Sequence, residues 1–214
     1  MESCAASGVR RPRPTAPRPA PAVVGSSAAA TTQEDVVTDR LELDAAWLSD
    51  DDLELTRDRV PMVYVIALPV RTNAHGLVTH VGLLLRMMPD GTVSRAVVAG
   101  RVLYGERVRE ALLRHLERDL GTMALPRLPT EPQPFTVAEF FPDPSVSGFH
   151  DPRQHAVALA YVVPVDGDCE PSQEALDLTW VTPDEAVSES MVLDMTGGQD
   201  RLVRLALAHV GCLP

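Results

Sequence analysis

The chain has 214 residues, 45% hydrophobic and 23% charged, which is the composition of an ordinary globular protein. Its formal net charge of −11, with every basic residue an arginine, argues against nucleic-acid binding because a phosphate backbone attracts basic surfaces. No apolar run approaches the roughly 20 residues that span a bilayer. The three cysteines form neither a CxxC pair nor a disulfide framework. We therefore expect a cytoplasmic protein with no nucleic-acid or membrane partner.

Two regions of different composition are predicted. Residues 1–44 contain a segment rich in Pro, Ala and Arg, then a segment rich in Ala, Ser and Thr, and few large apolar side chains. Such a segment cannot offset the entropy of ordering, so it is predicted to be a disordered tail. Residues 45–214 are predicted to form one domain.

The first predicted elements of the domain are a short helix and three strands. Ser49 followed by three aspartates resembles a capping box, and Pro61 ends the helix. Residues 62–70 are almost continuously apolar, as in a strand covered on both faces. Strands at 78–87 and 93–99 are predicted to form a hairpin around the Pro89-Asp90-Gly91 turn.

A helix is predicted over 106–120 (ERVREALLRHLERDL), because Val108, Leu112, Leu116 and Leu120 follow one another at i+4 spacing. Gly121 is a typical stop signal for such a helix. The remaining predicted elements are strands near 135–141, 155–165 and 176–181, a helix starting at Thr182-Pro183, and a final helix over 199–209. Strands and helices do not alternate strictly, so we expect an α+β fold with a mixed sheet sandwiched by helices.

The segment from Gly100 to Gly121 resembles the Nudix box, Gly-x5-Glu-x7-Arg-Glu-U-x-Glu-Glu-x-Gly-U, in which U is bulky and apolar. The matching positions are Gly100, Glu106, Arg114, Leu116 and Gly121. The later segment Trp180–Glu185 is also similar to one found in many Nudix proteins. The resemblance implies a Nudix-like α/β/α sandwich that hydrolyses nucleoside diphosphate derivatives with Mg²⁺ or Mn²⁺ held on the box helix. It also implies that Glu106 and Arg114 help to hold the loop and the helix in place.

The chain departs from the box at its three acidic core positions, which are His115, Arg118 and Asp119. Their formal charges cancel with histidine neutral, whereas three carboxylates would give −3. Mg²⁺ sites depend on carboxylate charge, so we expect a degenerate box with weakened affinity for Mg²⁺ or Mn²⁺.

Three interpretations of these replacements remain open. In the first, His115 and Asp119 are the catalytic residues and ligands of a reduced metal site, in which imidazole favours Zn²⁺, Mn²⁺ or Fe²⁺. In the second, Arg118 binds a substrate phosphate directly. In the third, catalysis has been lost. Taken singly, His115 is better explained as a solvated histidine, and Arg118 with Asp119 as a surface charge pair; only the alignment with the box favours a functional role.

Weaker candidates lie outside the box. Arg153 and His155 are predicted substrate contacts, with His150 nearby, and either Glu139 or Glu174 could add a carboxylate to a metal site. The leading hypothesis is a divergent Nudix-type hydrolase acting on a nucleoside diphosphate derivative or another phosphorylated small molecule. The alternative is an inactive Nudix-like module that binds a nucleotide, a metabolite or a protein, because a fold alone does not fix a function. The sequence does not define the oligomeric state.

Overall fold

The computed structural model describes residues 48–88, 91–171 and 175–213. The predicted tail, residues 1–44, lies outside these ranges, as do Pro89–Asp90 of the predicted turn and the candidate Glu174. In the described part of the chain, no helix combines the length and the apolar character that a membrane crossing requires.

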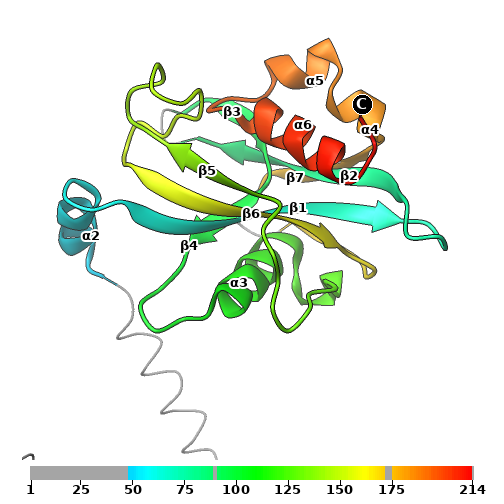
Figure 1. Ribbon diagram of the computed structural model, residues 1–214, viewed down its shortest axis with the longest axis horizontal. Coiled ribbons are helices and arrows are strands. Elements are labelled where there is room, and N and C mark those ends of the chain that lie inside the picture. Colours follow the sequence, from blue (N-terminus) through cyan, green and yellow to red (C-terminus); the bar gives the residue numbers. More distant parts are fainter. Residues whose placement is uncertain (1–47, 89–90, 172–174, 214) are drawn as a thin grey trace, which may run out of the picture. The chain divides into compact units, whose positions relative to one another are not determined.

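A mixed seven-stranded sheet forms the middle layer of the domain (Figure 1). Its strands are β1 (Met62–Thr72), β2 (Val78–Met87), β3 (Val93–Ala96), β4 (Val98–Arg101), β5 (Thr136–Phe140), β6 (Ala156–Pro164) and β7 (Asp177–Val181). The central strand β1 pairs in parallel with β6, while its other edge pairs antiparallel with β2 and then with β4. Strands β3 and β7 both pair antiparallel with β2, and β5 pairs antiparallel with β6. The predicted mixed sheet is confirmed.

Helices cover both faces of the sheet, as in an α/β/α sandwich (Figure 1). They are α2 (Asp50–Arg57), α3 (Val108–Leu120), α4 (Pro183–Ala186), α5 (Glu189–Leu193) and α6 (Gln199–His209), with a short 3-10 turn, η1 (Thr122–Ala124). The start of α2 has the predicted cap, since the Ser49 side chain accepts a hydrogen bond from the amide of Asp52. Thr182 likewise caps α4, but this helix has a single turn before α5 begins.

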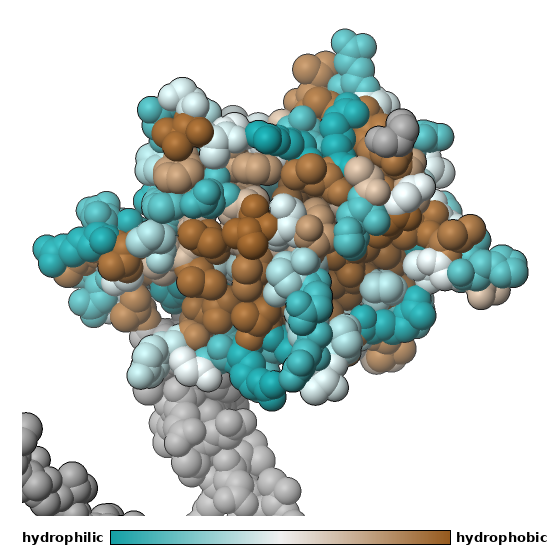
Figure 2. All heavy atoms as spheres, in the orientation of Figure 1, coloured by the Kyte–Doolittle hydropathy of each residue, from teal (hydrophilic) through white to brown (hydrophobic). Residues whose placement is uncertain are grey.

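The alternation of side chains along β1 builds one core on each face of the sheet. Val65 and Ala67 belong to the core that α3 covers, whereas Ile66, Leu68 and Val70 belong to the core that α6 covers. Successive strand residues point to opposite faces, so a nearly continuous apolar run is what a strand between two helical layers needs. On the outer surface, apolar side chains remain visible over β5 and β6 (Figure 2).

The prediction of one strand over 93–99 was wrong. Val97 interrupts it: its amide donates to the side-chain oxygen of Gln199 on α6 (3.3 Å) instead of to a neighbouring strand. The chain thereby passes from β3, on the edge of β2, to β4, on the edge of β1. No glycine or proline in residues 93–99 marks this change of partner, which places Gly100 and Arg101 beside the box helix.

Helix α3 packs closely on β4 because Gly100 on the strand lies opposite the imidazole ring of His115 on the helix. Ala111, Leu112, Leu116 and Leu120 form its buried apolar side, and the helix ends at Gly121, whose φ of +84° suits glycine. A Cβ atom built on Gly100 would overlap the imidazole ring of His115. The glycine of the box therefore permits this histidine to lie against the strand.

We expect Gly100→Ala to lower the free energy of unfolding by about 1–3 kcal/mol, because the added methyl group overpacks a filled site. Urea denaturation of purified variants measures this loss. The same change in a His115→Ala background should cost clearly less, since the ring that it meets is gone. Equal losses in the two backgrounds would contradict the packing explanation.

Candidate functional site

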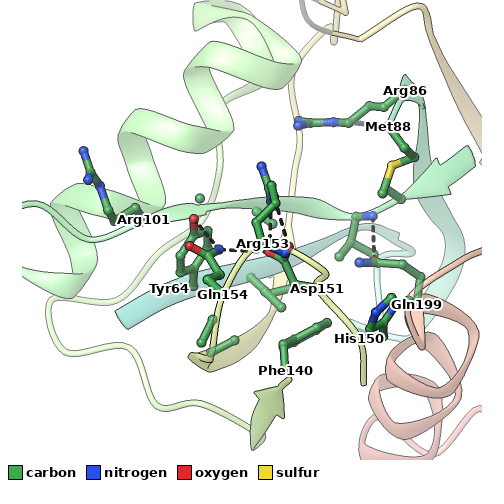
Figure 3. A pocket seen from close by; sticks show the side chains of 18 of the residues that line it. Tyr64, Arg86, Met88, Arg101, Phe140, His150, Asp151, Arg153, Gln154 and Gln199 are labelled. Atoms are coloured by element: carbon green, nitrogen blue, oxygen red, sulfur yellow. Dashed lines mark hydrogen bonds and ion pairs between the residues drawn. The ribbon is translucent and has the colours of Figure 1, made fainter. Parts of the chain in front are cut away.

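A cleft of about 700 Å³ opens beside the box helix, and its size falls within the range of small-molecule sites (Figure 3). Strands β1, β2 and β4, helix α3, the loop 150–154 and the start of α6 contribute to its walls. Its apolar surface includes Ile66, Phe140, Ala156 and Ala158. The cleft thus combines an apolar floor with charged walls.

Arginines dominate the charge of this cleft. Those that line it are Arg57, Arg86, Arg101, Arg118 and Arg153. Among the described lining residues, Asp151 is the one carboxylate. In a chain of net charge −11, this concentration of positive charge favours an anionic ligand in the cleft.

The carboxylate of Asp119 lies buried between two of these arginines. Asp119 is 0% exposed. Arg118 donates from Nε to Oδ1 (2.8 Å), and Arg86, from β2, donates from Nη2 to Oδ2. A second nitrogen of Arg118 donates to the backbone oxygen of Ala99 (3.2 Å), which ties this cluster to β4. Asp119 is therefore a buried, doubly paired anion and not part of a solvated surface pair.

His115 is also buried, at 2% exposure, instead of solvated. Because a carbonyl oxygen can only accept, Nε2 of His115 must carry the proton that it donates to the oxygen of Arg101 (3.0 Å). Burial lowers the pKa of His115 to about 4, with further lowering from the charges of Arg114 and Arg118. The ring is neutral at pH 7, and its Nδ1 has no hydrogen-bond partner among the described residues.

Glu106 and Arg114 form a bidentate ion pair between the loop and helix α3. Both carboxylate oxygens of Glu106 accept from Arg114, at 2.7 Å each, and the amide of Leu103 donates to Oε2 (2.9 Å). Arg114 also donates to the backbone oxygen of Arg101 (2.9 Å). Burial raises the pKa of Glu106, but the hydrogen bonds from Arg114 and Leu103 outweigh it and hold this pKa below its ordinary value. These contacts fix the loop between β4 and α3 and the end of β4, where Arg101 lies.

A second polar network holds the opposite wall of the cleft. The buried Gln154 donates to Tyr64 (2.8 Å) and Asp151 (2.9 Å), and it accepts from Arg57 (3.1 Å). Asp151 accepts two hydrogen bonds from the guanidinium of Arg153, at 2.9 Å each. Burial raises the pKa of Asp151, but the hydrogen bonds from Arg153 and Gln154 hold it below the ordinary value. This wall is preorganised before any ligand binds.

The donor set beside α3 does not fit a divalent cation of the Nudix kind. In the described ranges, no group of three or more His, Cys, Asp and Glu side chains lies close enough together to hold a metal ion. Of the two predicted ligands, Asp119 accepts from two guanidinium groups and His115 uses Nε2 on a backbone oxygen. A cation there would have to displace Arg86 and Arg118 from Asp119, and it would meet their positive charge.

The structure brings some of the predicted residues together and separates others. His115 and Arg118 line the cleft, and Arg153 lines it while paired with Asp151. His155 is not among the lining residues: its ring stacks on Phe141, with 4.3 Å between the ring centres. Glu139 is exposed on β5 and does not line the cleft either.

Four important cleft residues were not predicted, namely Arg57, Arg86, Arg101 and Gln154. Arg86 had a detectable signal, because it is a charge that directly follows three leucines within a predicted strand. Arg101 follows the box glycine but is not itself a box position. Nothing in the pattern around Gln154 indicates that its side chain is buried.

Comparison with solved structures identifies the class of fold. A structure described as a possible asymmetric diadenosine tetraphosphate (Ap4A) hydrolase from Jonesia denitrificans DSM 20603 is 58% identical, with a TM-score of 0.71 over 73% of this chain and 98% of that one. A MutT Nudix hydrolase from Burkholderia pseudomallei is 19% identical, with a TM-score of 0.51 over 69% of this chain and 98% of that one. A bifunctional NMN adenylyltransferase/ADP ribose pyrophosphatase from Francisella tularensis, complexed with AMP and a Mn ion, is 14% identical, with a TM-score of 0.51 over 84% of this chain and 49% of that one. The last two show the fold alone, and it is the Nudix fold.

A family model described as "Domain of unknown function (DUF4916)" matches residues 43–212. The chain therefore belongs to this family and is a divergent member of the Nudix hydrolase superfamily. No curated protein matches the chain significantly.

The burial of a neutral His115 predicts a pH dependence of stability. The unfolded histidine has a pKa of about 6.5, so acid protonates the unfolded chain before the folded one, and stability is lost as the pH falls from about 6.5 towards 4. We expect this residue alone to cost about 2 kcal/mol between pH 7 and pH 5, measured by urea denaturation at both values.

The matched variants are His115→Gln and His80→Gln. His115→Gln should lack this loss of stability between pH 7 and pH 5, whereas His80→Gln, on the exposed side of β2, should show it in full. If His115→Gln and the wild-type protein lose stability in parallel between these pH values, His115 is not held neutral by the fold.

Proposed function

We propose that this chain is a Nudix-type hydrolase of a phosphorylated nucleotide derivative, with weakened dependence on a divalent metal. The observation that carries the proposal is the cleft lined by five arginines and one paired carboxylate. Guanidinium groups bind phosphates through charge-assisted and often bidentate hydrogen bonds. Nucleotide derivatives also present an apolar base or sugar face, which matches the apolar floor at Ile66 and Phe140.

Hydrolysis as the reaction is supported by the 58% identical relative, which is described as a possible Ap4A hydrolase. In such a reaction the oxygen of water forms a bond to phosphorus while the bridging P–O bond breaks. The leaving phosphate takes up the bond's electron pair, and the attacking water releases a proton to solvent. Fixed positive groups stabilise the charge that develops on the phosphoryl oxygens. Arg118 and Arg86 have this role in the proposal, because Asp119 holds both in place.

The donor set beside α3 supports the proposed weakened metal dependence. A site for Mg²⁺ relies on carboxylate oxygens, and here the carboxylate of Asp119 already accepts from two guanidinium groups. We therefore do not assign Asp119 or His115 as metal ligands. Arg153 remains a candidate contact on the opposite wall.

A second candidate function is ligand binding without turnover. The neutral His115, whose pKa is about 4, and the doubly paired Asp119 leave neither of the two predicted catalytic groups as an obvious base for water. The same cleft would then bind a nucleotide derivative as a sensor or partner domain. Both functions require binding of the same ligand, but only the first converts it to a product.

Incubation of the full chain with ADP-ribose and with Ap4A, each in Mg²⁺ and in EDTA, tests the proposal. Chromatography of the nucleotides should show products in both media, with less than about tenfold loss of rate in EDTA. Arg118→Gln should lower the rate by about tenfold or more, because one charge-assisted contact is worth about that factor. Arg109→Gln, which removes a charge from the same helix outside the cleft lining, is the control.

Turnover that EDTA abolishes would contradict the weakened metal dependence. Binding of both compounds without any product would select the second candidate. An absence of both binding and turnover would contradict the assignment of a nucleotide derivative as the ligand.

A further inference from the structure

Two side chains that line the cleft each carry a buried polar atom with no hydrogen-bond partner among the described residues. These atoms are Nε of Arg86 and Nδ1 of His115. Buried polar groups in folded proteins are nearly always paired, so each unpaired one requires an explanation. Because the two side chains that carry these atoms line one cleft, a molecule bound there is a candidate partner for both atoms.

The chemistry of each atom defines what that molecule must offer. Nε of Arg86 carries a hydrogen and can only donate, so its partner is an acceptor, and an anionic oxygen suits a guanidinium best. His115 donates from Nε2 to Arg101, so its neutral ring presents a lone pair at Nδ1, whose partner is a donor such as a hydroxyl group. A phosphate oxygen together with a hydroxyl group would satisfy both atoms.

Asp119 prepares Arg86 for this contact. Because Nη2 of Arg86 donates to Oδ2 of Asp119, the planar guanidinium is fixed with Nε as a further donor beside the cleft. Arg118, on the other side of the same carboxylate, is fixed through Nε and through Ala99. In Figure 3, Arg86 extends from β2 into the cleft. Ordering these long side chains in advance lowers the entropic cost of binding a ligand.

We infer that Arg86 and Arg118, oriented by Asp119, form a phosphate subsite that works in place of a divalent cation, with Asp119 as a positioning residue. Arg86 lies outside the box, on a strand that meets the box helix only in the folded chain. The inference rests on the proposed function for the kind of ligand, and it adds that Asp119 orients the two arginines as one subsite and that no metal ion joins them to the phosphate.

Calorimetric titration of the full chain with inorganic pyrophosphate in EDTA tests the subsite without requiring turnover. The wild-type protein should bind, and Arg86→Gln should bind at least tenfold more weakly. Arg109→Gln, which removes the same charge from outside the cleft, should stay within about twofold of the wild type. Arg86→Lys should also lose most of the affinity, since lysine keeps the charge but cannot contact Asp119 and a phosphate with one rigid fork.

Asp119→Asn distinguishes positioning from simple attraction. The change makes the cleft more positive, so charge alone predicts tighter binding of pyrophosphate, whereas loss of orientation predicts binding at least fivefold weaker. Circular dichroism and the melting temperature report whether this variant folds. If it does not fold, the Arg86→Lys titration decides in its place.

Equal binding by the wild type, Arg86→Gln and Arg109→Gln would overturn the subsite, as would pyrophosphate binding that appears only when Mg²⁺ is added. Titration with ADP-ribose shows whether the subsite alone is wrong or the proposed function is wrong as well. If ADP-ribose binds the wild type and Arg86→Gln equally, the subsite is wrong while the proposed ligand stands. If neither compound binds with or without Mg²⁺, the proposed function itself fails.

Discussion

The arrangement of the site depends on one buried anion, the carboxylate of Asp119, held between the guanidinium groups of Arg86 and Arg118. A buried carboxylate requires compensation that water would otherwise supply, and removal of one partner from such a pair is strongly destabilising. Two arginines provide this compensation at the place where a Nudix box would present several carboxylates to a cation. The same interaction therefore joins β2 to α3, fixes two positive groups beside the cleft and engages the one acid left at the three core positions of the box.

The neighbouring contacts extend this constraint to the rest of the cleft. The Glu106–Arg114 pair holds the loop between β4 and α3, and His115 lies against Gly100 with a hydrogen bond to Arg101. On the far wall, Gln154 links Tyr64, Asp151 and Arg57. The positive groups are thus positioned by polar contacts made within the folded chain, which is the condition for electrostatic preorganisation.

Much of the fold could be predicted from the sequence because its signals are local. The i+4 stripe of Val108–Leu120 and the glycine at 121 predicted α3, and the apolar run at 62–70 predicted a strand covered on both faces. The change of strand at Val97 could not be predicted, because it depends on a hydrogen bond that the Val97 amide donates to Gln199 on the last helix. In the site, the replacements at His115, Arg118 and Asp119 were visible, but their burial was not. Arg86 reaches Asp119 across 33 positions of the sequence, so no spacing rule links the two residues.

A crystal structure of the full chain with both Mn²⁺ and inorganic pyrophosphate, measured for anomalous scattering at the manganese edge, tests the central claim most directly. The account predicts pyrophosphate oxygens on Arg86 and Arg118, both still paired with Asp119, and no anomalous peak at that carboxylate. A manganese peak within about 2.2 Å of the Asp119 oxygens, with the two guanidinium groups displaced, would contradict it.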